Sequence, residues 1–161
     1  MKAEIRNIPE KKFIGMAMRM SFAENKTVAL WRGFMPRRAE IPHTISSELY
    51  SGEIYPANYF NPFNPVTEFE KWALVEVASP ASVPPGMETL TSPAGTYAVF
   101  IRRGPASDGP KTYQHIFGVW LPQSDYLLDE RPHFAVMGEK YKHDAADSEE
   151  ELWIPIKPRA R

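Results

Sequence analysis

The chain of 161 residues contains no cysteine, so it has no disulfide, no thiolate metal ligand and no cysteine nucleophile. It has no apolar run long enough to span a bilayer and no signal-peptide pattern. Its formal net charge of −1 lacks the positive excess of proteins that bind nucleic acid by neutralising phosphates. We therefore expect a cytoplasmic protein with no membrane partner and no direct nucleic-acid partner.

Proline and aromatic residues, by contrast, are abundant. Sixteen prolines are spread along the chain, and 12% of the residues are aromatic. Because proline interrupts helices and marks strand ends, this distribution predicts a β-rich α+β fold. The length suits a single domain (1–161), and the aromatic supply leaves some rings for a binding surface.

The hydrophobic pattern predicts elements whose order repeats. Strands are expected over 13–20, 49–55, 69–78, 95–102, 132–137 and 149–157. Helices are expected over 26–35, with Asn25 as N-cap and with Pro36 ending or kinking the helix, and over 111–121, stopped by Pro122. A linker at 79–85 separates halves of about 1–80 and 86–161. Two β-α-β-β units in tandem would form an antiparallel sheet with two helices on one face and a ligand cleft between the units.

The closing strand combines acids with a tryptophan. Because alternate residues of a strand share a face, Glu149, Glu151 and Trp153 point one way, while Leu152 and Ile154 point the other. A carboxylate beside a large ring suits a flat, cationic ligand. Alternatively, Glu151 lies on the solvent side of an edge strand and Trp153 is a peripheral anchor.

Four segments carry a resemblance to a known family. They read LWRGFMPRR at 30–38, FEKWALVEV at 69–77, WLPQS at 120–124 and ELWIPI at 151–156. From about residue 5 to 157 the chain resembles the GyrI-like small-molecule-binding family. That family includes the effector-binding domains of AraC-type and MerR-type multidrug-responsive transcription activators.

The resemblance implies two SHS2-like β-α-β-β modules and a bulky, aromatic, cationic ligand in the cleft between them. It places the closing-strand glutamate, here Glu151, at the bottom of the pocket. The aromatic residues that the resemblance assigns to the pocket walls are Trp153, Tyr55 and Trp72, with Trp31, Tyr59 and Phe60 as further candidates. Family transcription factors carry a helix-turn-helix domain ahead of this module. This chain begins within a few residues of its first strand, so we expect a stand-alone form without direct gene regulation.

The resulting functional hypothesis is a sensor or sequestering protein for such molecules, with no cofactor and no bound metal. A second hypothesis, also implied by the resemblance, is a hydrolase that opens cyclopropane rings of DNA-alkylating natural products. In that reaction Glu151 would activate water and Tyr55 would stabilise the developing negative charge. A third is a gyrase-interacting protein, for which the chain shows no specific surface.

Each candidate side chain also has a purely structural explanation. Tyr55, Trp72 and Trp153 could be core residues of a small α+β protein. The aromatics on the predicted helices, Trp31, Phe34, Phe117 and Trp120, fit helix-to-sheet packing. His133 and His143 stand near Glu139 and Asp144, but no histidine has the paired spacing of a metal site.

Overall fold

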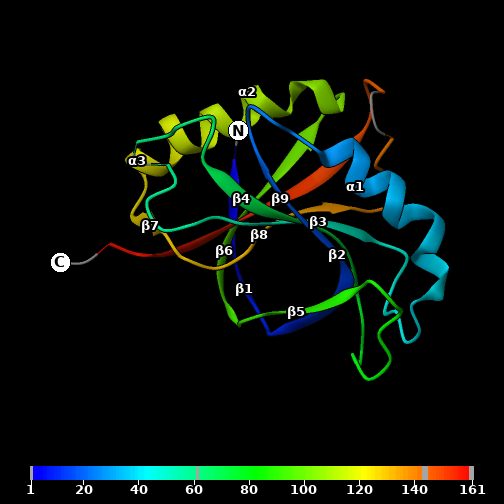
Figure 1. Cartoon of the computed structure of the whole chain (residues 1–161). Coiled ribbons are helices and arrows are strands. Elements are labelled where there is room, and N and C mark those ends of the chain that lie inside the picture. Colours follow the sequence, from blue (N-terminus) through cyan, green and yellow to red (C-terminus); the bar gives the residue numbers. More distant parts are fainter. Residues whose placement is uncertain (1, 61, 143–144, 160–161) are drawn as a thin grey trace.

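The computed structural model describes residues 2–60, 62–142 and 145–159. These residues form an α+β fold around one large antiparallel sheet (Figure 1). The strands are β1 (Ala3–Ile8), β2 (Lys11–Ser21), β3 (Leu49–Ile54), β4 (Glu68–Glu76), β5 (Glu88–Ser92), β6 (Gly95–Arg103), β7 (Tyr126–Leu128), β8 (His133–Met137) and β9 (Glu149–Pro158). The α-helices are α1 (Thr27–Phe34), α2 (Gly109–His115) and α3 (Leu121–Gln123). The 3₁₀-helices are η1 (Met35–Glu40) and η2 (Ala106–Asp108), and η3 (Ile116–Trp120) is π-helical.

The order of the strands interleaves the two halves of the chain. It runs β1-β6-β9-β8-β3-β4-β2-β5, with β7 beside β9. The chain passes from β1 to β2 across only Pro9 and Glu10, yet β1 pairs with β6. Likewise β5 leads into β6 but pairs with β2. Strands β3 and β8, one from each half, meet in the middle of the sheet.

Alternate strand residues give the sheet two faces. On the helix face, α1 packs with Ile14 and Ala73, and the α2–α3 segment packs with Phe100 and Leu152. The opposite face carries what we call the strand-lined core: Phe13, Tyr50, Trp72, Leu74, Tyr97, Val99, Phe134, Val136 and Trp153. All of these side chains are buried, although each comes from a strand. The sheet therefore curls around its own side chains on this face.

Both helical segments differ in detail from the prediction. The prediction of Asn25 as N-cap was wrong by one residue, because the N-cap of α1 is Lys26, which makes no side-chain capping bond. Asn25 precedes it, and its Oδ1 accepts the backbone N–H of Thr27 over 2.9 Å. Next to Pro36 the α-helix gives way to the 3₁₀-helix η1, so the helical run changes its geometry there instead of stopping. Pro122 lies inside α3, one residue before its end. Each proline occupies the first turn of its new helix, where its missing N–H would have no intrahelical partner.

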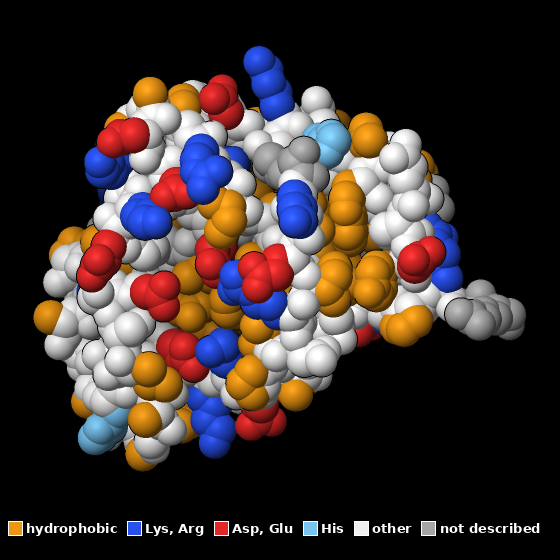
Figure 2. All heavy atoms as spheres, turned by 180° about the vertical axis from the view of Figure 1, so that it is seen from behind, with side chains coloured by type: hydrophobic (Ala, Val, Ile, Leu, Met, Phe, Trp, Pro, Cys, Tyr) orange, Lys and Arg blue, Asp and Glu red, His pale blue; other side chains and the backbone are white. Residues whose placement is uncertain are grey.

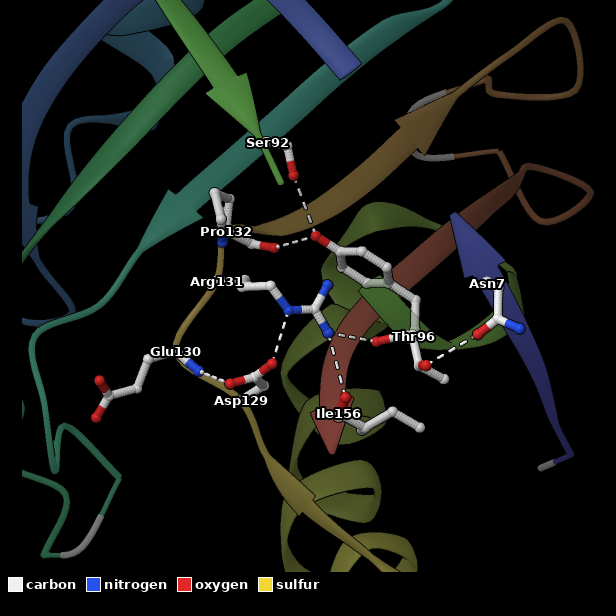
Figure 3. A network of polar contacts seen from close by, with 9 residues as sticks. Asn7, Ser92, Thr96, Asp129, Glu130, Arg131, Pro132 and Ile156 are labelled. Atoms are coloured by element: carbon white, nitrogen blue, oxygen red, sulfur yellow. Dashed lines mark hydrogen bonds and ion pairs between the residues drawn. The ribbon is translucent and has the colours of Figure 1, made fainter. Parts of the chain in front are cut away.

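A buried polar network joins β5, β6 and the start of β8 (Figure 3). The Tyr97 hydroxyl donates to the carbonyl of Pro132 over 3.0 Å and lies 3.2 Å from the Ser92 hydroxyl. The Arg131 guanidinium lies 4.7 Å from the Tyr97 ring centroid and pairs with Asp129 over 2.8 Å. The network holds the β5–β6 connection, where the chain passes from one end of the sheet toward the other.

The structure confirms the predicted α+β class, with its antiparallel sheet and its two helical segments. Each of the six predicted strands is present, with shifted ends. Strands β1, β5 and β7 were not predicted, because they are short edge segments without a clear apolar alternation. That the halves are modules of a tandem repeat stays a prediction. No helix among the described residues is long and apolar enough to cross a membrane.

Candidate functional site

The residues predicted from sequence to form one pocket lie on two faces of the sheet. Glu151, Trp153 and Trp72 lie on the strand-lined face. Tyr55, Tyr59, Phe60 and Trp31 lie on the helix face. The structure therefore does not bring Glu151 and Tyr55 together. The reason is strand alternation, since Tyr50 shares the face of Trp153 and Tyr55 is an odd number of residues further along.

The two tryptophans of the strand-lined face are core residues. Trp153 is 6% exposed and Trp72 is 5% exposed. The Trp153 ring packs edge-on against Tyr50, with centroids 5.9 Å apart, and against Phe134 at 6.2 Å. Both rings therefore make packing contacts in the core of the sheet.

Glu151 already has partners on this face. Its Oε1 accepts the indole N–H of Trp153 over 3.0 Å and lies 3.5 Å from Nη1 of Arg6. The carboxylate borders a surface cavity of about 320 Å³. The cavity is lined by Glu48, Ile101, Val136, Gly138, Glu139, Lys140, Glu149, Glu150 and Glu151. Glu149 thus lies at this cavity but is also paired with Arg103 and Lys140.

On the helix face, Tyr55 stands at the centre of an aromatic cluster. Its ring centroid lies 4.6 Å from that of Tyr59, 4.9 Å from Phe60, 5.2 Å from Phe69 and 4.8 Å from His133. Tyr59 is buried, so the loop after β3 packs onto the sheet. Four aromatic side chains thus surround one tyrosine.

Phe60 extends this cluster to the second helical segment. Its ring stacks on Phe117 of η3, with centroids 4.5 Å apart and planes 22° from parallel. Phe117 in turn stacks on Tyr113 of α2 at 6.2 Å. Trp31 lies on α1 at the other side, against Phe34. The aromatic side chains therefore fill the region between α1 and the α2–α3 segment; Asn61, in the same loop, lies outside the described residues.

A buried ion pair lies beneath this cluster. Glu53 of β3 and Lys71 of β4 are opposite each other in register, and Nζ lies 3.0 Å from Oε1. Their side chains are 8% and 16% exposed. Desolvation raises the pKa of Glu53, and the ammonium of Lys71 acts in the opposite direction. Glu53 is thus a buried carboxylate with one cationic partner.

A second ion pair lies on the same face, between β6 and the start of β9. Arg102 is 2% exposed and lies 2.6 Å from Oε1 of Glu150. Burial raises the pKa of the Tyr113 hydroxyl, and the nearby charges of Glu53 and Glu150 raise it further. Tyr113 therefore lies within electrostatic reach of both carboxylates.

The strands between the two ion pairs carry small side chains and a neutral histidine. Ala73, Ser51 and Ala135 are neighbours in register across β4, β3 and β8. Two residues further along β3, on the same face, Glu53 lies opposite His133. Burial, with a contribution from Arg131, lowers the pKa of His133 to about 3, so the imidazole is uncharged at neutral pH.

Sequence reasoning missed Glu53 and Lys71, although a signal was present. Phe69, Ala73 and Val75 alternate on the buried helix face of β4, and Lys71 interrupts that apolar series. A charged residue in an apolar series requires a partner. The next strand supplies one in Glu53, but the pairing depends on a register that a single strand does not reveal.

The described residues contain no group of histidine and acidic side chains arranged to hold a metal ion. His143 and Asp144, which stood in the histidine and acid pattern of the sequence, lie outside those residues.

The family model of the GyrI-like small molecule binding domain matches residues 1–157 of this chain. The chain belongs to this family. A DNA gyrase inhibitor from Erwinia billingiae is 32% identical over 98 residues, which cover 57% of this chain and 61% of that protein. The matched part thus spans less than two thirds of this relative's length.

Solved structures share the fold at low sequence identity. SAV2435 bound to tetraphenylphosphonium superposes with a TM-score of 0.74 at 12% identity, over 98% of this chain and 94% of that one. A hydrolase from Listeria innocua superposes with a TM-score of 0.58 at 11% identity, over 97% and 92%. The chain is thus a GyrI-like small-molecule-binding domain whose fold neighbours include a ligand-bound protein and a hydrolase.

Proposed function

We propose that the GyrI-like domain binds a bulky aromatic small molecule on the helix face, between α1 and the α2–α3 segment. The observation that supports this site is the aromatic cluster around Tyr55, which lies over the buried carboxylate of Glu53. The rings would contact the apolar body of the ligand. Glu53 is already paired with Lys71, so this buried carboxylate does not need a positively charged group of the ligand.

The fold neighbour SAV2435 was solved bound to tetraphenylphosphonium, a bulky aromatic molecule, which supports a bulky aromatic ligand. Each desolvated contact between a cation and an aromatic ring contributes up to about 2 kcal/mol. The function proposed is capture of such molecules, as a sensor or a sequestering protein. The separation of Glu151 from Tyr55 gives the hydrolase hypothesis no shared active site.

A surface cavity adjoins the aromatic cluster and offers an approach to it. It has a volume of about 220 Å³ and is lined by Arg19, Ile54, Tyr55, Pro56, Glu68, Phe69 and Glu70. Phe60, which packs against Tyr55, stacks on Phe117 and so links the cluster to the second helical segment. A bulky ligand would therefore enter beside Tyr55 and take the place of this stack.

The proposal is tested by calorimetric titration with the cation tetraphenylphosphonium and the uncharged triphenylphosphine oxide. Tyr55→Leu keeps an apolar side chain at this position but removes the ring. The affinity for each probe that the wild type binds should therefore fall by roughly tenfold. Phe22→Leu is the matched control, because that ring is 59% exposed and contacts Phe63 instead of Tyr55.

Glu151→Gln distinguishes the two faces. We expect it to leave both affinities within about twofold of the wild type, since Glu151 faces away from the aromatic cluster. A loss confined to Glu151→Gln, with Tyr55→Leu unchanged, would move the site to the strand-lined face. Failure of both probes to bind the wild type and all of its variants would refute the proposed ligand class.

A further inference from the structure

The charged groups of the proposed site are already paired with one another. Glu53 and Lys71 lie 3.0 Å apart, and Arg102 and Glu150 lie 2.6 Å apart. Beside them His133 is uncharged at neutral pH. The described part of this site therefore holds two positive and two negative charges. The face of the molecule seen in Figure 2 also carries acidic and basic side chains close together, and neither sign dominates it.

The two ion pairs differ in how firmly the cation is held. Arg102 also donates to the carbonyls of Gly104 and Pro105, so its guanidinium is fixed by several acceptors. The ammonium of Lys71 has one hydrogen-bond acceptor among the described residues, Glu53. A lysine ammonium is compact and sits on a flexible stem, and this one is 16% exposed. Lys71 is thus the cation that can leave.

We propose that Lys71 is the resident cation of Glu53 and thereby sets the charge preference of the site. This inference rests on the proposed function. A cationic ligand can reach Glu53 only by displacing the Lys71 ammonium, which exchanges one ion pair for another. An uncharged aromatic ligand leaves the Glu53–Lys71 ion pair intact and does not require this exchange. The wild-type domain therefore prefers uncharged aromatic ligands to cations of the same shape, and specificity arises from a repulsive charge built into the site.

The test compares tetraphenylphosphonium with triphenylphosphine oxide on the wild type and on Lys71→Met, at pH 8 so that Glu53 can ionise. Methionine keeps much of the apolar volume and removes the charge. We expect Lys71→Met to bind the cation at least about tenfold more tightly. Its affinity for the uncharged probe should stay within about twofold.

Three variants control this result. Lys11→Met removes a lysine of similar burial, 18% exposed and 3.2 Å from Glu76, on the opposite face, and should change neither affinity. Lys71→Arg keeps the charge and should retain the wild-type preference. The double variant Lys71→Met/Glu53→Gln should lose the cation gain, because no carboxylate remains to attract it. It also serves as the readout if Lys71→Met alone is too unstable, since it leaves no buried unpaired charge.

The outcomes separate this inference from the proposed function. If the probes bind, but the wild type and Lys71→Met have equal affinities for the cation, the proposed role of Lys71 is wrong. The proposed binding site would not be affected by that result. The same conclusion follows if the double variant retains the cation gain. Binding weakened by roughly tenfold in Tyr55→Leu, together with a cation gain in Lys71→Met, would support both.

Discussion

Each face of the sheet places a carboxylate beside aromatic rings, but the partners of the two carboxylates differ. On the helix face, Glu53 is buried and pairs with Lys71. On the strand-lined face, Glu151 is 32% exposed, accepts the indole N–H of Trp153 and lies near Arg6. Glu70 accepts the indole N–H of Trp72 in the same way, over 2.6 Å. A carboxylate held by a core indole anchors the sheet, whereas a buried one held by a mobile ammonium can respond to the charge of a ligand.

The largest expected effect tests whether the tryptophans of the strand-lined face are core or ligand wall. Trp153→Ala removes a buried ring from the centre of the strand-lined core and should lower the free energy of unfolding by about 3–5 kcal/mol. Trp31→Ala removes a partly buried ring on α1 and should cost roughly 1–2 kcal/mol. Urea unfolding followed by far-UV circular dichroism measures both. Equal, small losses would show that Trp153 is not structural and would restore it as a ligand contact.

The next effect concerns acid sensitivity, which we assign to the helix face through His133. Its pKa is about 3 in the folded protein and about 6.5 when unfolded, so the folded state binds fewer protons between these values. The stability contributed by the neutral imidazole is complete above pH 6.5. It is lost as the pH falls toward 3, by up to about 5 kcal/mol.

His133→Phe checks this assignment. Phenylalanine keeps the ring contacts with Tyr55, Phe60 and Phe117 and cannot titrate. Between pH 6.5 and 4 the unfolding free energy of this variant should fall less than that of the wild type, whereas the exposed His43→Phe should follow the wild type. A His133→Phe curve parallel to that of the wild type would assign the acid sensitivity elsewhere.

The sequence predicted the α+β class and the six main strands, because these follow from local periodicity and from recognisable motifs. Tyr55, Tyr59 and Phe60 came from a single short segment, and they do lie together. The grouping of Glu151 with Tyr55 required knowing which faces two distant strands share across β8 and β9. That relation depends on pairing register, and a one-residue change moves a side chain to the other face. The ion pair between Glu53 and Lys71 could not be predicted from the sequence for the same reason.

The smallest effect is expected at Glu151, where a strong role in stability would contradict the distinction between the two carboxylates. Glu151→Gln keeps an oxygen that can accept the Trp153 indole N–H and loses only the charge facing Arg6. Because that pair is about one third exposed on both sides and therefore screened by solvent, the unfolding free energy should change by at most about 1 kcal/mol. Any difference should shrink further in 0.5 M salt, at which the screening length falls to about 4 Å. Lys71→Met, which leaves a buried carboxylate without its cation, should keep its stability defect at the same salt concentration. A Glu151→Gln loss as large and as salt-resistant as that of Lys71→Met would mean that the two faces hold their carboxylates in equivalent ways.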